Sequence, residues 1–411
     1  MANPPVSSHG SGTPGQIILD ENIMACTSKL KINEKKTYSL AVLQQRLKPS
    51  RIFKSAVEND ASGPPGRYNL PNHITGLTFD DFGDFLLTAS EDETFRLYNA
   101  KTGKHVKTLA SKKYGVDLPR FTHKNTTIVY ASTKEDDTIR YHSLHDNKYL
   151  QYFRGHKKKV ISLDVSPVDD GFMSSSLDNT VRLWDLRSPQ CRGLLNLPAP
   201  PVVAYDSTGV VFAVAVNQYS RILLYDMSNF DKDPFKTIHL DDVRLAKISY
   251  PPRIPVMTSM SFSTNGKWLL VGTAGEVHYV LDAFDGDLLC RLEGHLGLER
   301  GKTGNSLGVV PDRGISGEEV CWTPDSRFVV SGSQTGKIHV WDVAKFLERQ
   351  PPLTPQSEVP TLNASLSLDG HPGASRCVKF NPRNCMMATA GAELAFWLPE
   401  ASTDGSKQPG N

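Results

Sequence analysis

The feature of this sequence that most constrains its fold is an internal repeat. Its clearest copy runs from Gly155 to Arg187 and reads as a Gly-His turn, two apolar alternating stretches, an Asp turn, and a final stretch ending in Trp184-Asp185. Apolar residues alternate with polar ones within each stretch, and turn residues bound it, which indicates β-strands. A repeat of roughly 40–45 residues is typical of a four-stranded propeller blade.

Seven copies of this unit can be aligned on the last two residues of the third stretch. They are Tyr98-Asn99, His142-Ser143, Trp184-Asp185, Tyr225-Asp226, Leu281-Asp282, Trp341-Asp342 and Trp397-Leu398. The first three intervals are 44, 42 and 41 residues, and the later ones, of 56, 60 and 56, imply insertions. Pro-, Gly- or Ser-rich stretches near 247–255, 297–317 and 349–365 are predicted to be these inserted loops.

The seventh copy ends soon after its Trp, so it lacks an outermost strand, while residues 51–57 form a predicted strand before the first copy. We expect this N-terminal strand to complete the last blade, because ring closure removes exposed sheet edges. The predicted fold is therefore all-β, a seven-bladed WD40 β-propeller closed by an N-terminal strand over residues 37–400. Residues 1–36 and 401–411 are expected to be disordered tails.

Bulk composition favours an intracellular binding protein. The formal net charge of the 411 residues is only +2, so charge-driven recognition must come from local patches. The six cysteines form no CxxC pair and suggest reduced thiols rather than a zinc site. No signal peptide or membrane-length apolar segment is evident. We therefore expect no metal, cofactor, small-molecule ligand or membrane association, and a cytosolic or nuclear location.

One set of polar residues in the clearest copy is predicted to be structural. In WD40 blades such residues form a buried hydrogen-bonded tetrad, here His156, Ser174 or Ser176, Asp178 and Trp184. The same residue types occur in hydrolase triads, but no G-x-S-x-G element accompanies them. Residues 297–303 end like a phosphate-binding loop but lack its first glycine. The chain is accordingly predicted not to be an enzyme.

Charged loops provide the candidate binding residues. The loops that lead into the second and third copies, and the turns between the middle strands of a blade, share one rim of a propeller. The basic and aromatic residues predicted there are Lys112, Lys113, Tyr114, Lys157, Lys158 and Lys159, with Arg120 and Arg140 as additional cations; the acidic ones are Glu91, Asp92 and Asp136. Solvated lysines are the plain alternative, but such a rim could bind an acidic or phosphorylated peptide and basic side chains of a partner.

Three segments go beyond a general propeller pattern. They are SKKYGVDLPRFTHKNTTIVYAS (111–132), DDTIRYHSLHDNKYLQYFRGH (136–156) and SPVDDGFMSSSLDNTVRLWDLRSPQC (166–191). They closely resemble the WD-repeat-containing protein 82 family and its fungal Swd-two type. The resemblance covers residues 70–240 strongly and continues more weakly to 398. The three later insertions and the long N-terminal segment depart from it.

The resemblance implies a non-catalytic nuclear scaffold in two assemblies. One is the COMPASS complex that methylates lysine 4 of histone H3, where the family binds the N-terminal region of the methyltransferase. The other is the cleavage and polyadenylation factor with its associated protein phosphatase, acting in mRNA 3′-end processing and transcription termination. The phosphorylated C-terminal domain of RNA polymerase II is a further partner, directly or through a neighbouring subunit.

Two other functions stay open on sequence alone. Trp184-Asp185-Leu186-Arg187 resembles the W-D-x-R element of substrate receptors of cullin-type ubiquitin ligases, although WD repeats also place Arg there for strand-end ion pairs. The other function is direct nucleic-acid binding. The basic loops do not have the interleaved aromatic residues that stack on bases.

Overall fold

The computed structural model describes residues 43, 47–58, 72–242, 244, 256–298, 316–349 and 358–399. The chain divides into Met1–Thr37, which lies outside these residues, and Tyr38–Asn411, which contains all of them. The expected tails and the predicted loop 247–255 therefore lie outside the described residues, as does most of the loop 297–317.

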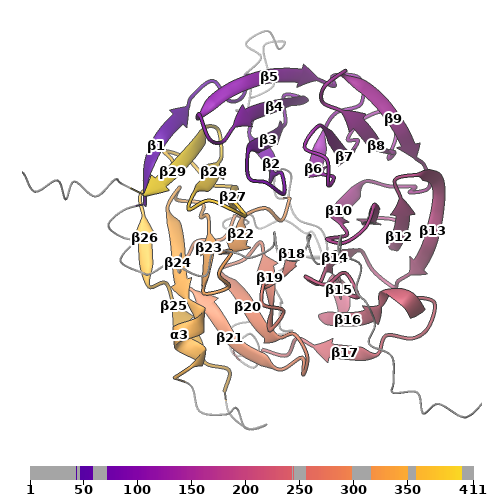
Figure 1. The fold of residues 1–411 in the computed structure, drawn as a ribbon. Helices are drawn as coiled ribbons and strands as arrows, with labels where there is room; N and C mark the ends of the chain where they lie inside the picture. Colours follow the sequence, from indigo (N-terminus) through magenta and orange to yellow (C-terminus); the bar gives the residue numbers. More distant parts are fainter. Residues whose placement is uncertain are drawn as a thin grey trace, which may run out of the picture. The chain divides into compact units, whose positions relative to one another are not determined.

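Seven sheets arranged in a ring form the second unit (Figure 1). Strands a to d of each blade run outward from the central channel. Blades 1 to 3 are β2 (Ile74–Phe79), β3 (Phe85–Ser90), β4 (Thr94–Asn99) and β5 (Lys104–Ala110); β6 (Asp117–Phe121), β7 (Thr127–Ala131), β8 (Ile139–Ser143) and β9 (Lys148–Phe153); and β10 (Val160–Val165), β11 (Gly171–Ser176), β12 (Thr180–Asp185) and β13 (Ser188–Asn196). Blade 4 is β14 (Pro201–Tyr205), β15 (Val211–Val216), β16 (Arg221–Asp226) and β17 (Lys236–His239).

The remaining blades carry the departures from a simple repeat. Blade 5 is β18 (Met257–Phe262), β19 (Trp268–Thr273), β20 (Val277–Asp282) and β21 (Leu288–Glu293); blade 6 is β22 (Val320–Trp322), β23 (Phe328–Ser331), β24 (Ile338–Asp342) and β26 (Leu366–Leu368); blade 7 is β27 (Cys377–Phe380), β28 (Met387–Ala390), β29 (Leu394–Pro399) and β1 (Leu47–Phe53). Short helical turns, η2 (Asn217–Tyr219), η3 (Met227–Asn229) and α3 (Val343–Leu347), follow strands of blades 4 and 6.

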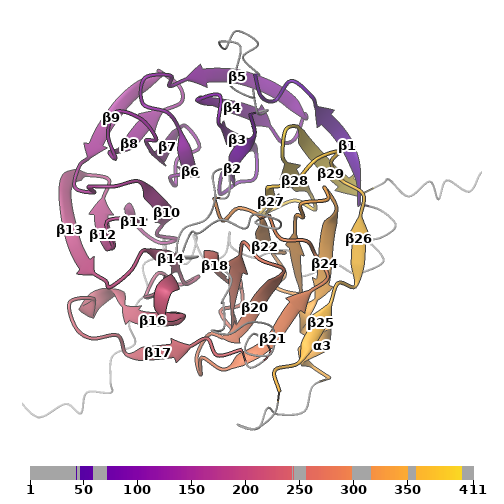
Figure 2. The same cartoon turned by 180° about the vertical axis from the view of Figure 1, so that it is seen from behind.

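The predicted closure by an N-terminal strand is confirmed, with different bounds. Strand β1 pairs antiparallel with β29 and is the outermost strand of blade 7, seen beside β29 in both ring views (Figures 1 and 2). It covers Leu47–Phe53 rather than residues 51–57, because its exposed side chains lack an apolar alternation that could mark its start. Pro49 is tolerated there because an outermost strand leaves one edge unpaired.

The stretch 349–365 is not wholly a loop. Its residues Thr361–Asn363 form β25, which pairs in parallel with β21 and gives blade 5 a fifth strand. The prediction of a loop was wrong here because three residues after a proline are too short to show a strand period. The free outer edge of β21 supplies the hydrogen bonds that the local sequence does not specify.

Apolar clusters lie between neighbouring blades and hold them face to face. Between blades 2 and 3, Trp184 stacks on Phe172 with ring centroids 6.2 Å apart and meets the edge of Phe153 at 5.6 Å. Removing such a buried indole costs about 3–5 kcal/mol. Similar apolar clusters lie at the other blade junctions.

Candidate partner-binding face

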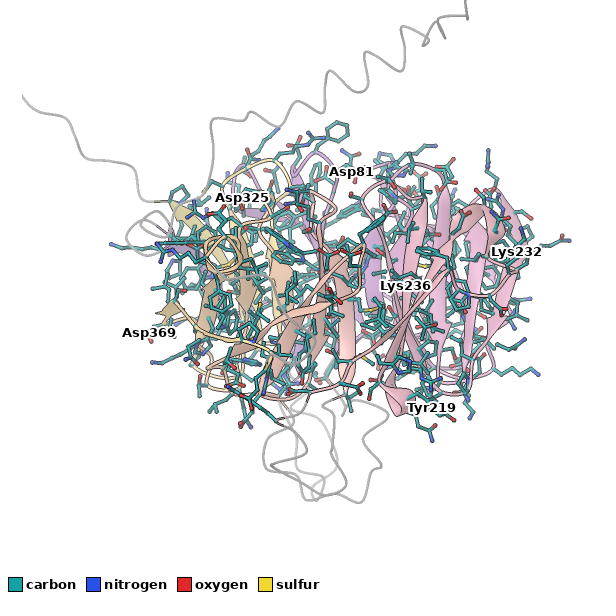
Figure 3. The ribbon with its side chains drawn as sticks, turned by 90° about the horizontal axis from the view of Figure 1, so that it is seen from below. Asp81, Tyr219, Lys232, Lys236, Asp325 and Asp369 are labelled. Carbon is teal, nitrogen blue, oxygen red and sulfur yellow. The ribbon has the colours of Figure 1, made fainter. Side chains whose placement is uncertain are left out.

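The ring has two faces with different loops. We call the d–a face the one built from loops joining strand d to the next strand a, such as 111–116 and 154–159, and from the b–c turns. The a–b face carries the a–b and c–d turns. In the side view of Figure 3, Asp81 and Asp325 of a–b turns lie at one end and Tyr219 of a b–c turn at the other.

The predicted lysines do share the d–a face. Lys112, Lys113, Lys157 and Lys158 are exposed, and within the described part of the chain no carboxylate lies within ion-pair distance of their ammonium groups. Lys159 differs, because its Nζ lies 3.2 Å from the Asp117 carboxylate. That ion pair joins the start of blade 2 to the loop entering blade 3, so it brings the two lysine loops together.

Tyr114 and Arg140 form a stacked pair below these loops. The Arg140 guanidinium lies 3.7 Å from the Tyr114 ring centroid and about 6 Å from the rings of Tyr149 and Tyr152. Its side chain is only 2% exposed, so the predicted role of Arg140 as a rim cation is wrong. Arg140 instead supports the loop that carries Lys112 and Lys113, and Tyr114 itself stays partly exposed.

The predicted acidic residues form hydrogen bonds or ion pairs with other residues of this chain. Asp136 receives two hydrogen bonds from Arg140, of 2.9 and 3.0 Å, and Asp92 pairs with Arg96 at 3.1 Å. Glu91 accepts a hydrogen bond from the His73 backbone. Burial opposes ionisation of Asp136, but the bonds from Arg140 and Thr138 outweigh it and keep its pKa below the ordinary value. The d–a face of blades 1 to 3 therefore presents free lysines more than free carboxylates.

Arg120 does not belong to this face. It projects from β6 into the central channel, where its Nη2 lies 2.6 Å from Glu318 of blade 6, and Lys379 of blade 7 lies 3.0 Å from the same carboxylate. The cavity there has a volume of about 180 Å³. The local sequence predicted a rim position because it cannot reveal a partner 198 residues away.

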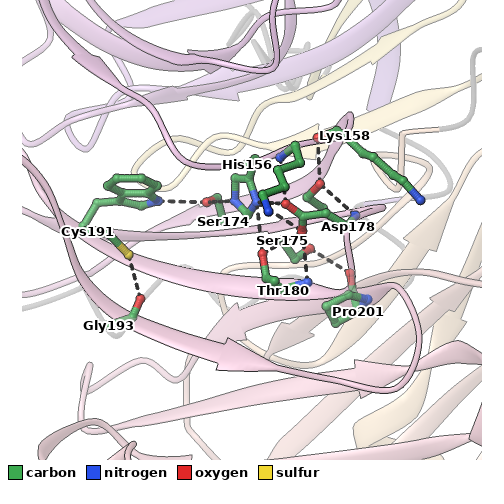
Figure 4. A network of polar contacts seen from close by, with 12 residues as sticks. His156, Lys158, Ser174, Ser175, Asp178, Thr180, Cys191, Gly193 and Pro201 are labelled. Atoms are coloured by element: carbon green, nitrogen blue, oxygen red, sulfur yellow. Dashed lines mark hydrogen bonds and ion pairs between the residues drawn. The ribbon is translucent and has the colours of Figure 1, made fainter.

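The tetrad of blade 3 is a continuous chain of polar contacts (Figure 4). Trp184 Nε1 donates to Ser174 Oγ at 2.9 Å, Ser174 Oγ lies 2.7 Å from His156 Nε2, and His156 Nδ1 lies 3.1 Å from Asp178. Burial lowers the pKa of His156 more than Asp178 raises it, so the imidazole is neutral at pH 7. A proton on Nδ1 then satisfies every member of the chain.

Of the two candidate serines, Ser174 joins the tetrad and Ser176 does not. Ser176 Oγ donates to the Lys158 carbonyl at 2.7 Å and accepts from the Asp178 backbone at 3.1 Å. It ties the lysine loop to the b–c turn instead. Because the Asp178 carboxylate also accepts from the Lys157 backbone at 2.9 Å, the tetrad and Ser176 together fix the loop that carries Lys157 and Lys158.

Sequence reasoning missed a related network in blade 7. Both His371 Nε2 and Trp397 Nε1 lie 2.8 Å from Thr389 Oγ1. The signal was the Gly-His pair at 370–371, which matches the one at 155–156. Threonine in place of serine hid the similarity.

Other predicted features have plain structural partners. Arg187 of the W-D-x-R element makes two hydrogen bonds to Asp185, of 2.9 and 2.8 Å, which is an ordinary strand-end ion pair. Within the described ranges, no three His, Cys, Asp or Glu residues lie close enough to hold a metal ion. Over the same ranges, no helix has the length and apolar character needed to cross a membrane.

Comparison with known proteins agrees with this architecture. The family described as WD domain, G-beta repeat matches residues 67–99, 147–185 and 318–342. WD repeat-containing protein 82 of Drosophila melanogaster is 43% identical over 79% of this chain and 90% of its own length. Set1 complex component swd2 of Schizosaccharomyces pombe is 38% identical over 80% and 93%, and COMPASS component SWD2 of Saccharomyces cerevisiae is 34% identical over 79% and 90%. The chain belongs to the WD repeat-containing protein 82 and Swd2 family.

Proposed function

We propose that this chain is a non-catalytic, nuclear scaffold subunit of a COMPASS-type histone H3 lysine 4 methyltransferase. Two of its relatives are named as components of the Set1 complex and of COMPASS, and the chain spans at least 90% of their lengths. The polar tetrad of blade 3 has a structural role, because its hydrogen bonds hold the adjoining loop in place. The exposed side chains of that loop are then available for partners. The N-terminal region of the methyltransferase and other COMPASS subunits are the proposed partners.

The observation that carries the binding proposal is the set of d–a face lysines that have no ion-pair partner among the described residues. Lys112 and Lys113 extend from one loop and Lys157 and Lys158 from the next, while Asp92 and Asp136 nearby are engaged by arginines of their own blades. Such a face attracts acidic segments and forms charge-assisted hydrogen bonds with phosphate or carboxylate groups. Fixed loops lower the ordering cost of binding.

We further propose that phosphorylated segments are bound on this face, with the C-terminal domain of RNA polymerase II as the first to test. The same chain would then also serve the cleavage and polyadenylation factor with its associated phosphatase, as family resemblance implies. The paired state of Arg187 gives no support to the cullin-type alternative.

The test is a pull-down with the full chain. The probes are the methyltransferase N-terminal segment and polymerase tail peptides with and without phosphate. We expect the phosphorylated peptide to bind more tightly, and a variant with Lys112, Lys113, Lys157 and Lys158 all changed to Glu to lose it by about 100-fold or more, because four attractive charges become repulsive.

The matched control reverses four exposed lysines of the a–b face. Changing Lys124, Lys232, Lys236 and Lys267 to Glu alters net charge equally but leaves the d–a face intact. Equal loss in both variants would indicate a general charge effect and contradict the proposed site. Unchanged affinity in the first variant would contradict it as well.

A further inference from the structure

The exposed apolar side chains of the ring are unevenly distributed. Among the described residues, five large ones lie on the a–b face and one, Tyr219, on the d–a face, while the others lie on outermost strands or, for Leu398, near the end of β29. The five are Phe82 (61% exposed), Val168 (68%), Val210 (56%), Phe235 (59%) and Phe284 (87%). Several exposed apolar residues on one face mark an interaction site more often than a single exposed residue does.

The turns that carry these residues contact one another around the channel. Asn381 of blade 7 donates to the Gly83 carbonyl at 2.7 Å, and His123 of blade 2 bridges the Asp81 carboxylate and the Asp169 carbonyl at 3.0 and 3.1 Å. A side chain at Gly209 would clash with Val168, so the turns of blades 3 and 4 also touch. Phe82, Val168 and Val210 therefore lie on a–b turns that are linked to one another by these contacts.

Exposed carboxylates accompany the apolar residues. Asp81 adjoins Phe82, and Asp170 lies two residues after Val168. Asp233 lies two residues before Phe235, and Asp285 directly follows Phe284.

Two cations near these positions are engaged within the chain, while Lys124 and Lys236 of the same face are exposed. Lys101 lies 2.7 Å from Asp84, and Arg187 is held by Asp185. In the a–b turns of blades 1 to 4, four carboxylates besides Asp84 that are exposed or partly exposed outnumber one exposed lysine, Lys124, so the surface around Phe82, Val168 and Val210 is acidic; the carboxylates are Asp81, Asp169, Asp170 and Asp206.

We propose that this a–b surface, centred on Phe82, Val168 and Val210, binds a segment of another protein with large apolar side chains flanked by lysine or arginine. The apolar groups would cover the three exposed residues, and the basic groups would pair with Asp170 and its neighbours. The inference goes beyond the proposed function, since it concerns the opposite face and the opposite charge. It makes the ring a bridge between two chemically different partners.

The test is selection of binders to the full chain from a library of random short peptides. We expect recovered peptides to combine aromatic or aliphatic residues with lysine or arginine. Their affinity should fall about tenfold in a Phe82→Ser/Val168→Ser variant, since removing interface anchors typically costs more than 1 kcal/mol. An Asp170→Lys/Asp285→Lys variant should weaken the same peptides.

A matched control removes apolar surface elsewhere. Leu150→Ser/Leu194→Ser changes two outer-strand residues of comparable exposure (48% and 44%) and should leave these peptides bound. The proposal is overturned if no peptide depends on Phe82 and Val168, or if those that do are acidic. It is also overturned if the surface mediates association of two copies of this chain, seen as a dimer that the Phe82→Ser/Val168→Ser variant dissolves. Loss of phosphopeptide binding in the lysine variant bears on the other face alone.

Discussion

The two faces of the ring are built from the same blades but differ in how their loops are held and in which side chains they expose. On the d–a face, neutral buried histidines such as His156 fix loops whose tips are free lysines. On the a–b face, a partly exposed His123 paired with Asp81 links turns that display apolar residues and carboxylates. Because the two sets of loops alternate along the chain, each face can acquire its own charge without disturbing the sheets. Each propeller repeat therefore contributes separate loops to two surfaces, and the composition of one surface does not determine that of the other.

The largest effect should come from the channel contact that joins blades 2, 6 and 7. Glu318→Ala leaves Arg120 and Lys379 without their shared carboxylate, and breaking a buried ion pair costs about 3–5 kcal/mol. Urea unfolding should show this loss, with hydrogen exchange accelerated on both faces. A loss confined to one face, or one smaller than about 1 kcal/mol, would mean that blades 2, 6 and 7 are not coupled through the channel.

A smaller effect should separate the faces. Ser174→Ala removes the partner shared by Trp184 and His156, which should cost about 2–3 kcal/mol. We expect faster hydrogen exchange at residues 154–159 on the d–a face and unchanged exchange at the a–b turn 166–170. Ser207→Ala, at an exposed serine of the a–b face, is the control and should change neither. Equal acceleration of both segments would argue against separate faces.

Acidification should reduce the stability contributed by buried histidines of the d–a face. Burial lowers the pKa of His295, in the loop between blades 5 and 6, to about 4, and that of His156 below its ordinary value. These groups take up protons on unfolding, so the stability they provide is present above pH 6.5 and is lost as pH falls towards their folded pKa. His295 alone should cost about 2 kcal/mol between pH 7 and pH 5.

His123 on the a–b face has the opposite sign. Burial disfavours its charged form, but Asp81 outweighs this and raises the pKa. Its contribution is therefore present below pH 6.5 and is lost as pH rises through the folded pKa. NMR titration of the two histidines should show His123 charging well above His295. The same order of midpoints with no loss of stability at pH 5 would show that the unfolded chain does not titrate as assumed.

The smallest effect should be on stability when the exposed apolar residues are changed. Phe82→Ser and Val168→Ser should alter the free energy of unfolding by no more than about 0.5 kcal/mol each, since both side chains are mostly exposed. Thermal unfolding would check this. A large loss would show that these residues are structural and would weaken their assignment to a partner surface.

The repeat made most of the fold predictable. The predicted strand ends from Tyr98-Asn99 to Trp341-Asp342 close the third strand of blades 1 to 6, because a period-2 pattern and a turn mark each one locally. Strands whose side chains are not buried were predicted less accurately, because they lack an alternating apolar pattern. Strand β1 is mostly exposed and began earlier than predicted, and β25 is specified by a free sheet edge rather than by its own three residues.

The candidate site was less predictable because charge pairing is a tertiary property. Nothing near Arg120 in the sequence reveals Glu318, and nothing near Arg140 shows that its guanidinium is buried against Tyr114. The lysine loops could be assigned to one face because loop type follows from strand order. Which of their charges remain unpaired required the structure.

The most direct test of the central claim is a competition measurement on the full chain. A phosphorylated polymerase tail peptide and an apolar-basic peptide selected as above would be titrated together and separately, and their dissociation constants compared. We expect each dissociation constant to be unchanged in the presence of the other peptide. The four-lysine variant should lose only the phosphorylated peptide, and the Phe82→Ser/Val168→Ser variant only the apolar-basic one. Mutual displacement, or loss of both peptides in either variant, would contradict two independent faces.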